Sequence, residues 1–125
     1  MILIDSNILI DIGNKDKQII ETVKELELKN KLSISIITEM EMLVGCRNKI
    51  EFQKLDKFLE RFVIYKITES IAELGKDLIK KYYLSHGLEI PDALIAATAL
   101  NLKIPLLTKN RKDFRFIETL ELLDI

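Results

Sequence analysis

The chain has 125 residues, of which 48% are hydrophobic and 31% are charged, and its 19 basic and 20 acidic side chains nearly cancel. This length and composition predict a single globular domain over residues 1–125 and exclude a disordered or fibrous chain. The balanced charge excludes nucleic-acid binding through overall basicity, so any RNA site must be local.

The first part of the chain alternates short apolar runs with amphipathic stretches. Residues 2–4 form a continuous apolar run, which predicts a strand buried on both faces. A short helix over residues 7–12 and an amphipathic helix around residues 19–26 follow. Residues 32–37 alternate between apolar and polar side chains, and this alternation predicts a second strand.

The middle of the chain carries two further helices and a strand. Thr38 is expected to begin a helix, in which Glu41 has the spacing of a capping box. The apolar spacing over residues 52–62 predicts another helix. Residues 63–67 are β-branched and aromatic, which favours a third strand, and Thr68 then caps the next helix.

The last part of the chain completes the alternation. The helix that Thr68 begins is expected to end near residues 86–87, and a helix rich in small apolar residues begins at residue 90. Residues 104–107 and 120–123 are the fourth and fifth predicted strands. Strands that alternate with helices indicate an α/β fold with a mainly parallel sheet of five strands covered on both faces.

Four acidic residues fall at one rim of this predicted sheet. Asp5 ends the first strand, and Asp113 lies in the loop after the fourth. Glu41 and Asp92 are each expected in the first turn of a helix. Ligands of parallel sheets bind beyond the carboxyl ends of the strands, and oxygen donors select hard cations such as Mg²⁺ or Mn²⁺. The pattern therefore favours metal-assisted chemistry on a phosphodiester.

Each acid also has a purely structural explanation. Glu41 completes a capping box, Asp92 stabilises a helix N-terminus, Asp5 caps a helix, and Asp113 suits a turn. Four independent coincidences at one rim are improbable, which favours the metal site. RNA cleavage by paired histidines is excluded because the chain contains one His.

Four segments resemble, in order, the motifs of the PIN-domain nucleases. They are residues 4–11, 35–45, 91–100 and 107–114. The residues in these motifs and the length of the chain are most similar to those of the VapC-type toxins of bacterial and archaeal toxin–antitoxin pairs. The resemblance implies a five-stranded, three-layer α/β/α sandwich that forms a homodimer. It also implies a Mg²⁺- or Mn²⁺-dependent endoribonuclease activity that leaves a 5′-phosphate and a 3′-hydroxyl. The implied partner is an antitoxin protein that covers the active site.

The resemblance also assigns individual residues. The acidic, catalytic positions of the family correspond to Asp5, Glu41, Asp92 and Asp113. Asn7 and Thr108 correspond to polar positions that support them. Some relatives carry the fourth acid where this chain has Asn110, so two roles stay open for Asp113: binding metal through water, or holding Asn110 and Thr108 in position. As a hypothesis, Asp5, Glu41 and Asp92 hold one or two Mg²⁺ ions.

Basic residues flank the fourth acid and are candidates for contacts with RNA phosphates. They are Lys109, Arg111, Lys112 and Arg115. The alternative is that they are ordinary solvated surface charges. The expected substrate is RNA, with transfer RNA and other structured RNA as candidates.

Two other functions are compatible with parts of this pattern. A phosphoacceptor signalling domain also uses acids and Mg²⁺ at the end of a parallel sheet, and Thr108 with Lys109 gives it slight support. That design needs an aspartate after the third strand, where this chain has Thr68, and paired acids after the first. A catalytically silent PIN-like fold that only binds a partner is the second rival, and the presence of all four acids argues against it.

Two features bear on location. Cys46 is the only cysteine and cannot form an internal disulfide, which agrees with a reducing cytoplasm. The apolar N-terminus lacks a basic lead and is interrupted by Asp5 and Asp11, so we expect neither a signal peptide nor a membrane span.

Overall fold

Parallel strands form the centre of the molecule. They are β1 (Ile2–Ile4), β2 (Leu32–Ser35), β3 (Val63–Tyr65) and β4 (Leu106–Leu107), in the order β3-β2-β1-β4. The computed structural model describes residues 1–124, and the strand pairs in this range are all parallel. The α/β class and the parallel sheet predicted from the sequence are confirmed. Every residue of β1 and β2 is buried, because helices lie on both sides of the sheet.

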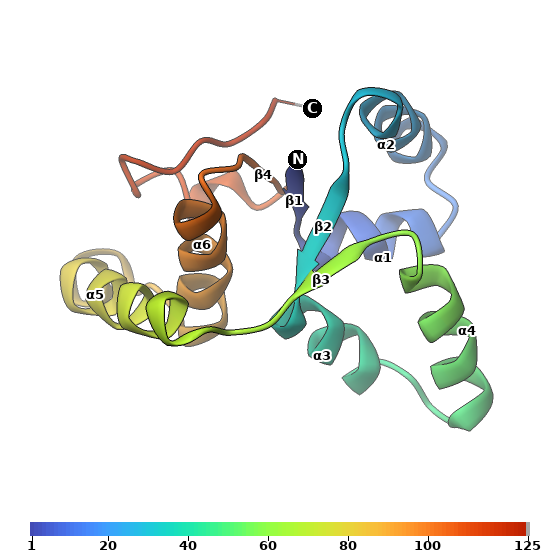
Figure 1. Cartoon of the computed structure of the whole chain (residues 1–125), viewed down its shortest axis with the longest axis horizontal. Helices are drawn as coiled ribbons and strands as arrows, with labels where there is room; N and C mark the ends of the chain where they lie inside the picture. The colour runs from blue at the N-terminus through green and yellow to red at the C-terminus, as the bar shows by residue number, and fades with distance from the viewer. Residues whose placement is uncertain (125) are drawn as a thin grey trace.

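The helices are α1 (Ser6–Gly13), α2 (Lys17–Lys29), α3 (Ile36–Val44), α4 (Lys49–Leu59), α5 (Glu69–His86) and α6 (Ile90–Leu102), and a short 3-10 helix, η1 (Arg111–Asp113), follows β4. Figure 1 shows α5 and α6 on one side of the strands and α1, α2 and α4 on the other. Within residues 1–124, no helix combines the length and the apolar character needed to cross a membrane.

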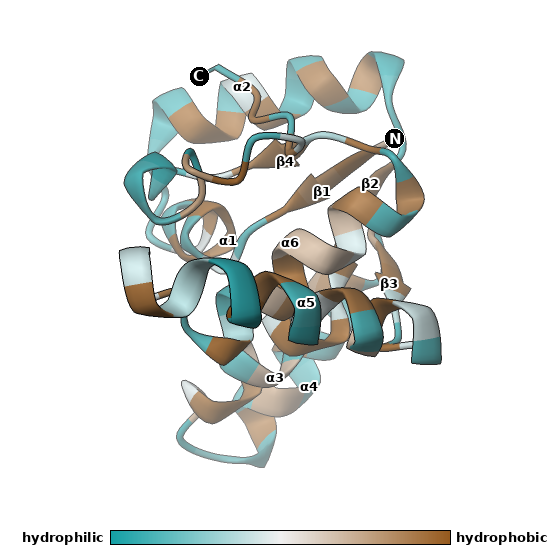
Figure 2. Ribbon diagram, turned by 90° about the vertical axis from the view of Figure 1, so that its left-hand side faces the viewer, coloured by the Kyte–Doolittle hydropathy of each residue, from teal (hydrophilic) through white to brown (hydrophobic). Residues whose placement is uncertain are grey.

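The core has two halves, one on each face of the sheet. Leu3 packs with α5 and α6, whereas Ile2 and Ile4 pack with α1, α2 and α4. Figure 2 shows α6 behind α5 and coloured largely as apolar, in contrast to the alternating colours of α5. Its alanines are almost fully buried, and a Cβ added at Gly75 of α5 would meet Leu94 of α6 at 3.0 Å. Small side chains therefore let the two helices approach closely.

The prediction of a fifth strand over residues 120–123 is wrong. Leu122 makes only an isolated parallel bridge with Leu106. The N–H of Leu106 donates to Glu121 over 2.9 Å, and its carbonyl accepts from Leu123 over 2.9 Å. Since β4 has two residues and successive residues face opposite neighbours, only Leu106 offers its backbone to this segment.

The boundary between β2 and α3 also differs from the prediction. Residues 36–37 belong to the helix, because the Oγ of Ser35 accepts the N–H of Ile37 over 3.0 Å and caps the helix three residues early. Thr38 is fully buried, and its Oγ1 has no partner among the described residues. The predicted capping box is therefore absent, and Glu41 lies in the second helical turn rather than the first.

Candidate active site

The register of β1 against β4 places Asp5 beside Thr108. Ile4 pairs with Leu107, and the N–H of Asp5 donates to the carbonyl of Leu107 over 3.0 Å. One polar residue directly follows each strand, and the hydroxyl of Thr108 donates to Oδ2 of Asp5 over 2.7 Å. The other oxygen, Oδ1, accepts the N–H of Ser6 over 2.8 Å at the start of α1. Both oxygens of this buried carboxylate therefore have donors.

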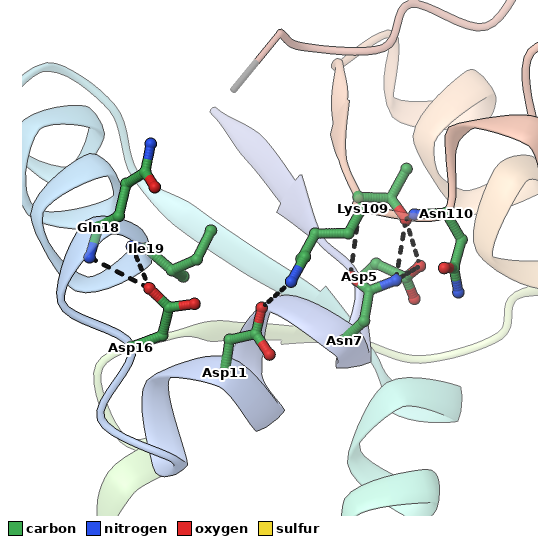
Figure 3. A network of polar contacts seen from close by, with 9 residues as sticks. Asp5, Asn7, Asp11, Asp16, Gln18, Ile19, Lys109 and Asn110 are labelled. Atoms are coloured by element: carbon green, nitrogen blue, oxygen red, sulfur yellow. Dashed lines mark hydrogen bonds and ion pairs between the residues drawn. The ribbon is translucent and has the colours of Figure 1, made fainter.

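Asn7 holds the two strand ends together from α1. Its Nδ2 lies 3.3 Å from Oδ2 of Asp5 and 3.2 Å from Oγ1 of Thr108. Its Oδ1 accepts the N–H of Lys109 over 3.2 Å, while the N–H of Asn110 donates to Oγ1 of Thr108 over 3.1 Å. Figure 3 shows this network around Asp5. The amide, the hydroxyl and two backbone N–H groups together fix the orientation of Asp5.

Asp5 carries a raised pKa because it is buried. The hydrogen bonds from Thr108 and Ser6 act in the opposite direction, since they stabilise the charged form, and the charge of Asp113 raises the pKa further. Asp5 is 5% exposed, so its charge lies at the edge of the core. An uncompensated carboxylate in such a place is costly unless a cation comes near it.

Asp92 carries a strongly raised pKa. Burial first, and then the charges of Asp5, Asp113, Glu41 and Glu89, raise its pKa to about 7. Its position in the first turn of α6 would by itself favour the ionised form. The neighbouring negative charges and the burial therefore outweigh the favourable helix terminus.

Glu41 and Asp113 complete the acidic cluster. Glu41 is exposed on α3, yet partial burial of its carboxylate and then the charge of Asp5 raise its pKa, against a hydrogen bond from Ser6. Asp113 ends η1 and acts on both Asp5 and Asp92 through its charge. The fold thus brings the four predicted acids into one electrostatically coupled group, hereafter the acid cluster (Asp5, Glu41, Asp92 and Asp113).

The donor chemistry of the acid cluster fits a hard cation. Within residues 1–124, no three His, Cys, Asp or Glu side chains stand in an arrangement that could hold a metal ion unaided. Mg²⁺ usually keeps several waters and binds through one or two carboxylates, so it needs no closed cage of protein ligands. Charges within the acid cluster contribute to the raised pKa of Asp5, Glu41 and Asp92, and together they provide the excess negative charge that such a hydrated ion would neutralise.

The four basic candidates occupy different environments. Nζ of Lys109 forms an ion pair with Asp11 of α1 (Figure 3). Arg111 donates to the carbonyl of Leu123 over 2.8 Å and lies 3.4 Å from the carboxylate of Asp124. Lys112 and Arg115 are both exposed, and Lys112 lines a pocket that also contains two members of the acid cluster. Only Lys112 is therefore placed directly beside the acids.

Sequence reasoning missed three residues around the site. Asp11 pairs with Lys109 across 98 positions, and no sequence pattern links the two. His86 ends α5 as expected, with Gly87 as its cap at a φ of 68°, but its ring also lines the pocket beside Asp92 together with Phe116. The position of His86, six residues before Asp92, was the one available signal.

Comparison with known proteins identifies relatives over nearly the whole chain. The family model described as PIN domain matches residues 2–119. Ribonuclease VapC19 of Mycobacterium tuberculosis is 31% identical over 123 residues, which cover 97% of this chain and 98% of the relative. Ribonuclease VapC1 of Methanocaldococcus jannaschii is 36% identical over 115 residues, which cover 90% of this chain and 78% of the relative.

Solved structures give the same picture. A toxin–antitoxin complex from Klebsiella pneumoniae contains a chain with a TM-score of 0.80 and 33% identity, with complete coverage of both chains. VapBC2 from Rickettsia felis, bound to a DNA fragment from its promoter, gives a TM-score of 0.84 and 28% identity over 100% of this chain and 99% of the other.

Proposed function

The chain belongs to the PIN-domain family, as its motifs predicted, and we propose that it is a VapC-type endoribonuclease that requires Mg²⁺ or Mn²⁺. The acid cluster supports this proposal more than any other observation. Its members come from four separate parts of the chain, and burial together with mutual repulsion raises the pKa of Asp92 to about 7. Strongly perturbed carboxylates that converge at one sheet edge are typical of functional sites rather than of helix caps.

In this proposal Asp5, Glu41 and Asp92 would hold the metal. A bound divalent ion supplies an activated water and neutralises charge on the phosphate. The chain's own contribution is to keep the oxygens of Asp5 fixed, through the hydroxyl of Thr108 and the amide of Asn7. Asp113 adds negative charge that favours the cation, either directly or through a water. No described hydrogen bond joins its carboxylate to Thr108 or Asn110, which disfavours the role of holding those residues.

The proposed partners follow from the relatives. Several similar solved chains come from toxin–antitoxin or VapBC complexes, so we expect this chain to have an antitoxin partner. The homodimer remains a prediction from the family resemblance. Helices α3 and α4 expose large apolar side chains that such a partner would cover. These side chains are Met40, Val44, Ile50 and Phe52.

The test of the proposed function compares the wild type with Asp5→Asn on total RNA and on transfer RNA. Each protein is assayed with Mg²⁺, Mn²⁺ or EDTA, and the ends of any product are identified. Asn accepts the same capping hydrogen bond, so folding should persist while cleavage falls by at least about a hundredfold. Full activity of Asp5→Asn would refute the assignment.

Asp16→Asn is the matched control. Asp16 also caps a helix, accepting N–H groups of Gln18 and Ile19, but its charge is not among the causes that raise the pKa of Asp5, Glu41 or Asp92. We expect this variant to cleave as the wild type does. Absence of cleavage by the wild type on every RNA would shift the conclusion to a silent, partner-binding PIN fold.

A further inference from the structure

A small polar pocket opens beside two members of the acid cluster. Its volume is about 200 Å³, and its walls include Asp92, Asp113, Lys112, His86 and Phe116. The end of α5 and the start of α6 form one wall, and the segment that contains η1 forms the other. Anything held in this pocket therefore touches the same carboxylates that are proposed to hold the metal.

Aromatic rings form an ordered stack at the edge of this pocket. The ring of His86 lies on that of Phe116, with centroids 4.3 Å apart and an interplanar angle of 11°. Phe116 in turn packs against the buried ring of Tyr82 at 5.3 Å. The ring of Tyr82 also meets that of His86 edge-on, with centroids 6.0 Å apart, and His86 remains exposed to solvent although Phe116 covers one of its faces.

A hydrogen bond fixes the rotation of the His86 ring. Its Nδ1 lies 2.8 Å from Oγ of Ser85, while Nε2 has no partner among the described contacts. An exposed planar ring that is held by packing on one face and by a hydrogen bond at one nitrogen is a preorganised surface for another flat group. Nucleobases stack on His and Phe rings in this manner.

We propose that this pocket binds the nucleotide adjacent to the cleaved bond, with its base stacked on His86 and its backbone phosphate paired with Lys112. The inference rests on the proposed ribonuclease function and adds a substrate-positioning site to it. Lys112 is the one cation in a lining that otherwise carries Glu89, Asp92 and Asp113, and a phosphate needs that cation to approach these acids. The shared lining places this nucleotide next to the reacting phosphate.

The test uses binding rather than cleavage. In the Asp5→Asn background, a single-stranded oligoribonucleotide that contains 2-aminopurine is titrated with the protein in the presence of Mg²⁺. The chain contains no Trp that could report binding by its own fluorescence. The probe therefore supplies the signal, because its fluorescence is quenched when its base stacks. His86→Ala should weaken binding about tenfold and abolish quenching of the probe, whereas His86→Phe should retain the quenching.

Controls separate stacking and charge from general damage. Tyr83→Ala removes an exposed aromatic ring from the same helix but outside the pocket lining, and it should leave binding unchanged. Lys112→Ala should lower the slope of binding affinity against salt concentration by about the amount expected for one phosphate contact. Lys80→Ala removes an exposed lysine of α5 and should leave this slope unchanged. Circular dichroism checks that each variant remains folded.

Failure of the nucleotide pocket and failure of the proposed ribonuclease function give different results. Equal affinity and quenching for His86→Ala and its parent would overturn the pocket while leaving a cleaving wild type as a nuclease. A wild type that neither binds nor cleaves RNA would overturn the ribonuclease proposal, and the pocket assignment with it. Loss of quenching in His86→Ala with recovery in His86→Phe supports stacking, because the quenching reports contact between the probe base and the ring, and circular dichroism shows that the fold is retained.

Discussion

Thr108 donates its hydroxyl hydrogen to Oδ2 of Asp5 over 2.7 Å, although 103 positions separate the two residues. The contact exists because β1 and β4 are neighbours whose last paired residues are Ile4 and Leu107. Both side chains are buried, so the bond is shielded from competing water and its donor directly stabilises the charged carboxylate. It therefore couples strand pairing to the ionisation of the central acid.

Thr108→Val should reveal that coupling. The substitution keeps the side-chain shape but removes the donor, so we expect the free energy of unfolding at neutral pH to fall by about 1–2 kcal/mol. The pKa of Asp5 should rise further, since this bond lowers it, and the acidic limb of the pH–rate profile should move to higher pH. Urea unfolding and cleavage rates across pH measure the two effects. Thr108→Ser retains the hydroxyl and should resemble the wild type in both.

Asp92 predicts how the stability of the metal-free protein depends on pH. Its pKa rises from 3.8 to about 7 in the folded state, so the folded chain holds this proton more tightly than the unfolded chain does. Stability in EDTA should therefore fall as the pH rises from about 4 through about 7, and this group should have no further effect above that.

Asp92→Asn removes the carboxyl group that is expected to cause this pH-dependent loss of stability. The variant should exceed the wild type in free energy of unfolding by roughly 1–2 kcal/mol at about pH 8, discounted because solvent reaches the carboxylate, and should match it at about pH 4. Chemical denaturation over this range provides the measurement. A constant difference at every pH would mean that packing, rather than ionisation, distinguishes the two proteins.

Divalent metal should reverse this destabilisation. With Mn²⁺ at about one hundred times its dissociation constant, binding to the folded state alone adds roughly 2.7 kcal/mol and raises the Tm by roughly 10 °C. Protons compete with the ion for the carboxylates, so the increase should be larger at about pH 8 than at about pH 6. Thermal unfolding of wild type, Asp5→Asn and Asp16→Asn should show the shift reduced only in Asp5→Asn. A silent PIN-like fold would show no shift at all.

Much of this architecture could be predicted because local patterns determine it. The unbroken apolar run of β1 follows directly from burial on both faces, and Thr68 begins α5 through a standard cap. The acid cluster was predictable as well, since the carboxyl ends of parallel strands meet at one edge. Such predictions need only the type of each element and the order of the elements along the chain.

The remaining features depend on tertiary contacts that no local pattern encodes. Ser35 and Thr38 both suit a helix N-cap, and burial of the Thr38 side chain decided between them. The predicted last strand became a single bridge at Leu122 because β4 is too short to pair with more. The stacking of His86 on Phe116 joins the end of α5 to the chain beyond η1, which only the folded molecule brings together.

The Asp11–Lys109 ion pair predicts a variant that binds RNA more tightly. Asp11 raises the pKa of Lys109 through a hydrogen bond and its charge, so the lysine stays charged, but a phosphate must displace the carboxylate to reach it. Asp11→Asn should therefore strengthen binding of an oligoribonucleotide about two- to fivefold in the Asp5→Asn background, as expected for an exposed ion pair. Lys109→Ala should weaken binding and lower its salt dependence.

The control for that gain is Asp56→Asn, which removes an equal charge from the exposed surface of α4. An equal increase in RNA affinity in the two variants would mean that net charge alone causes the increase and that Lys109 has no specific role. If Lys109 contacts phosphate, adding Lys109→Ala to Asp11→Asn should abolish the gain, because the benefit of losing Asp11 passes through the lysine that it releases. Fluorescence anisotropy at two salt concentrations supplies all the affinities that this cycle requires.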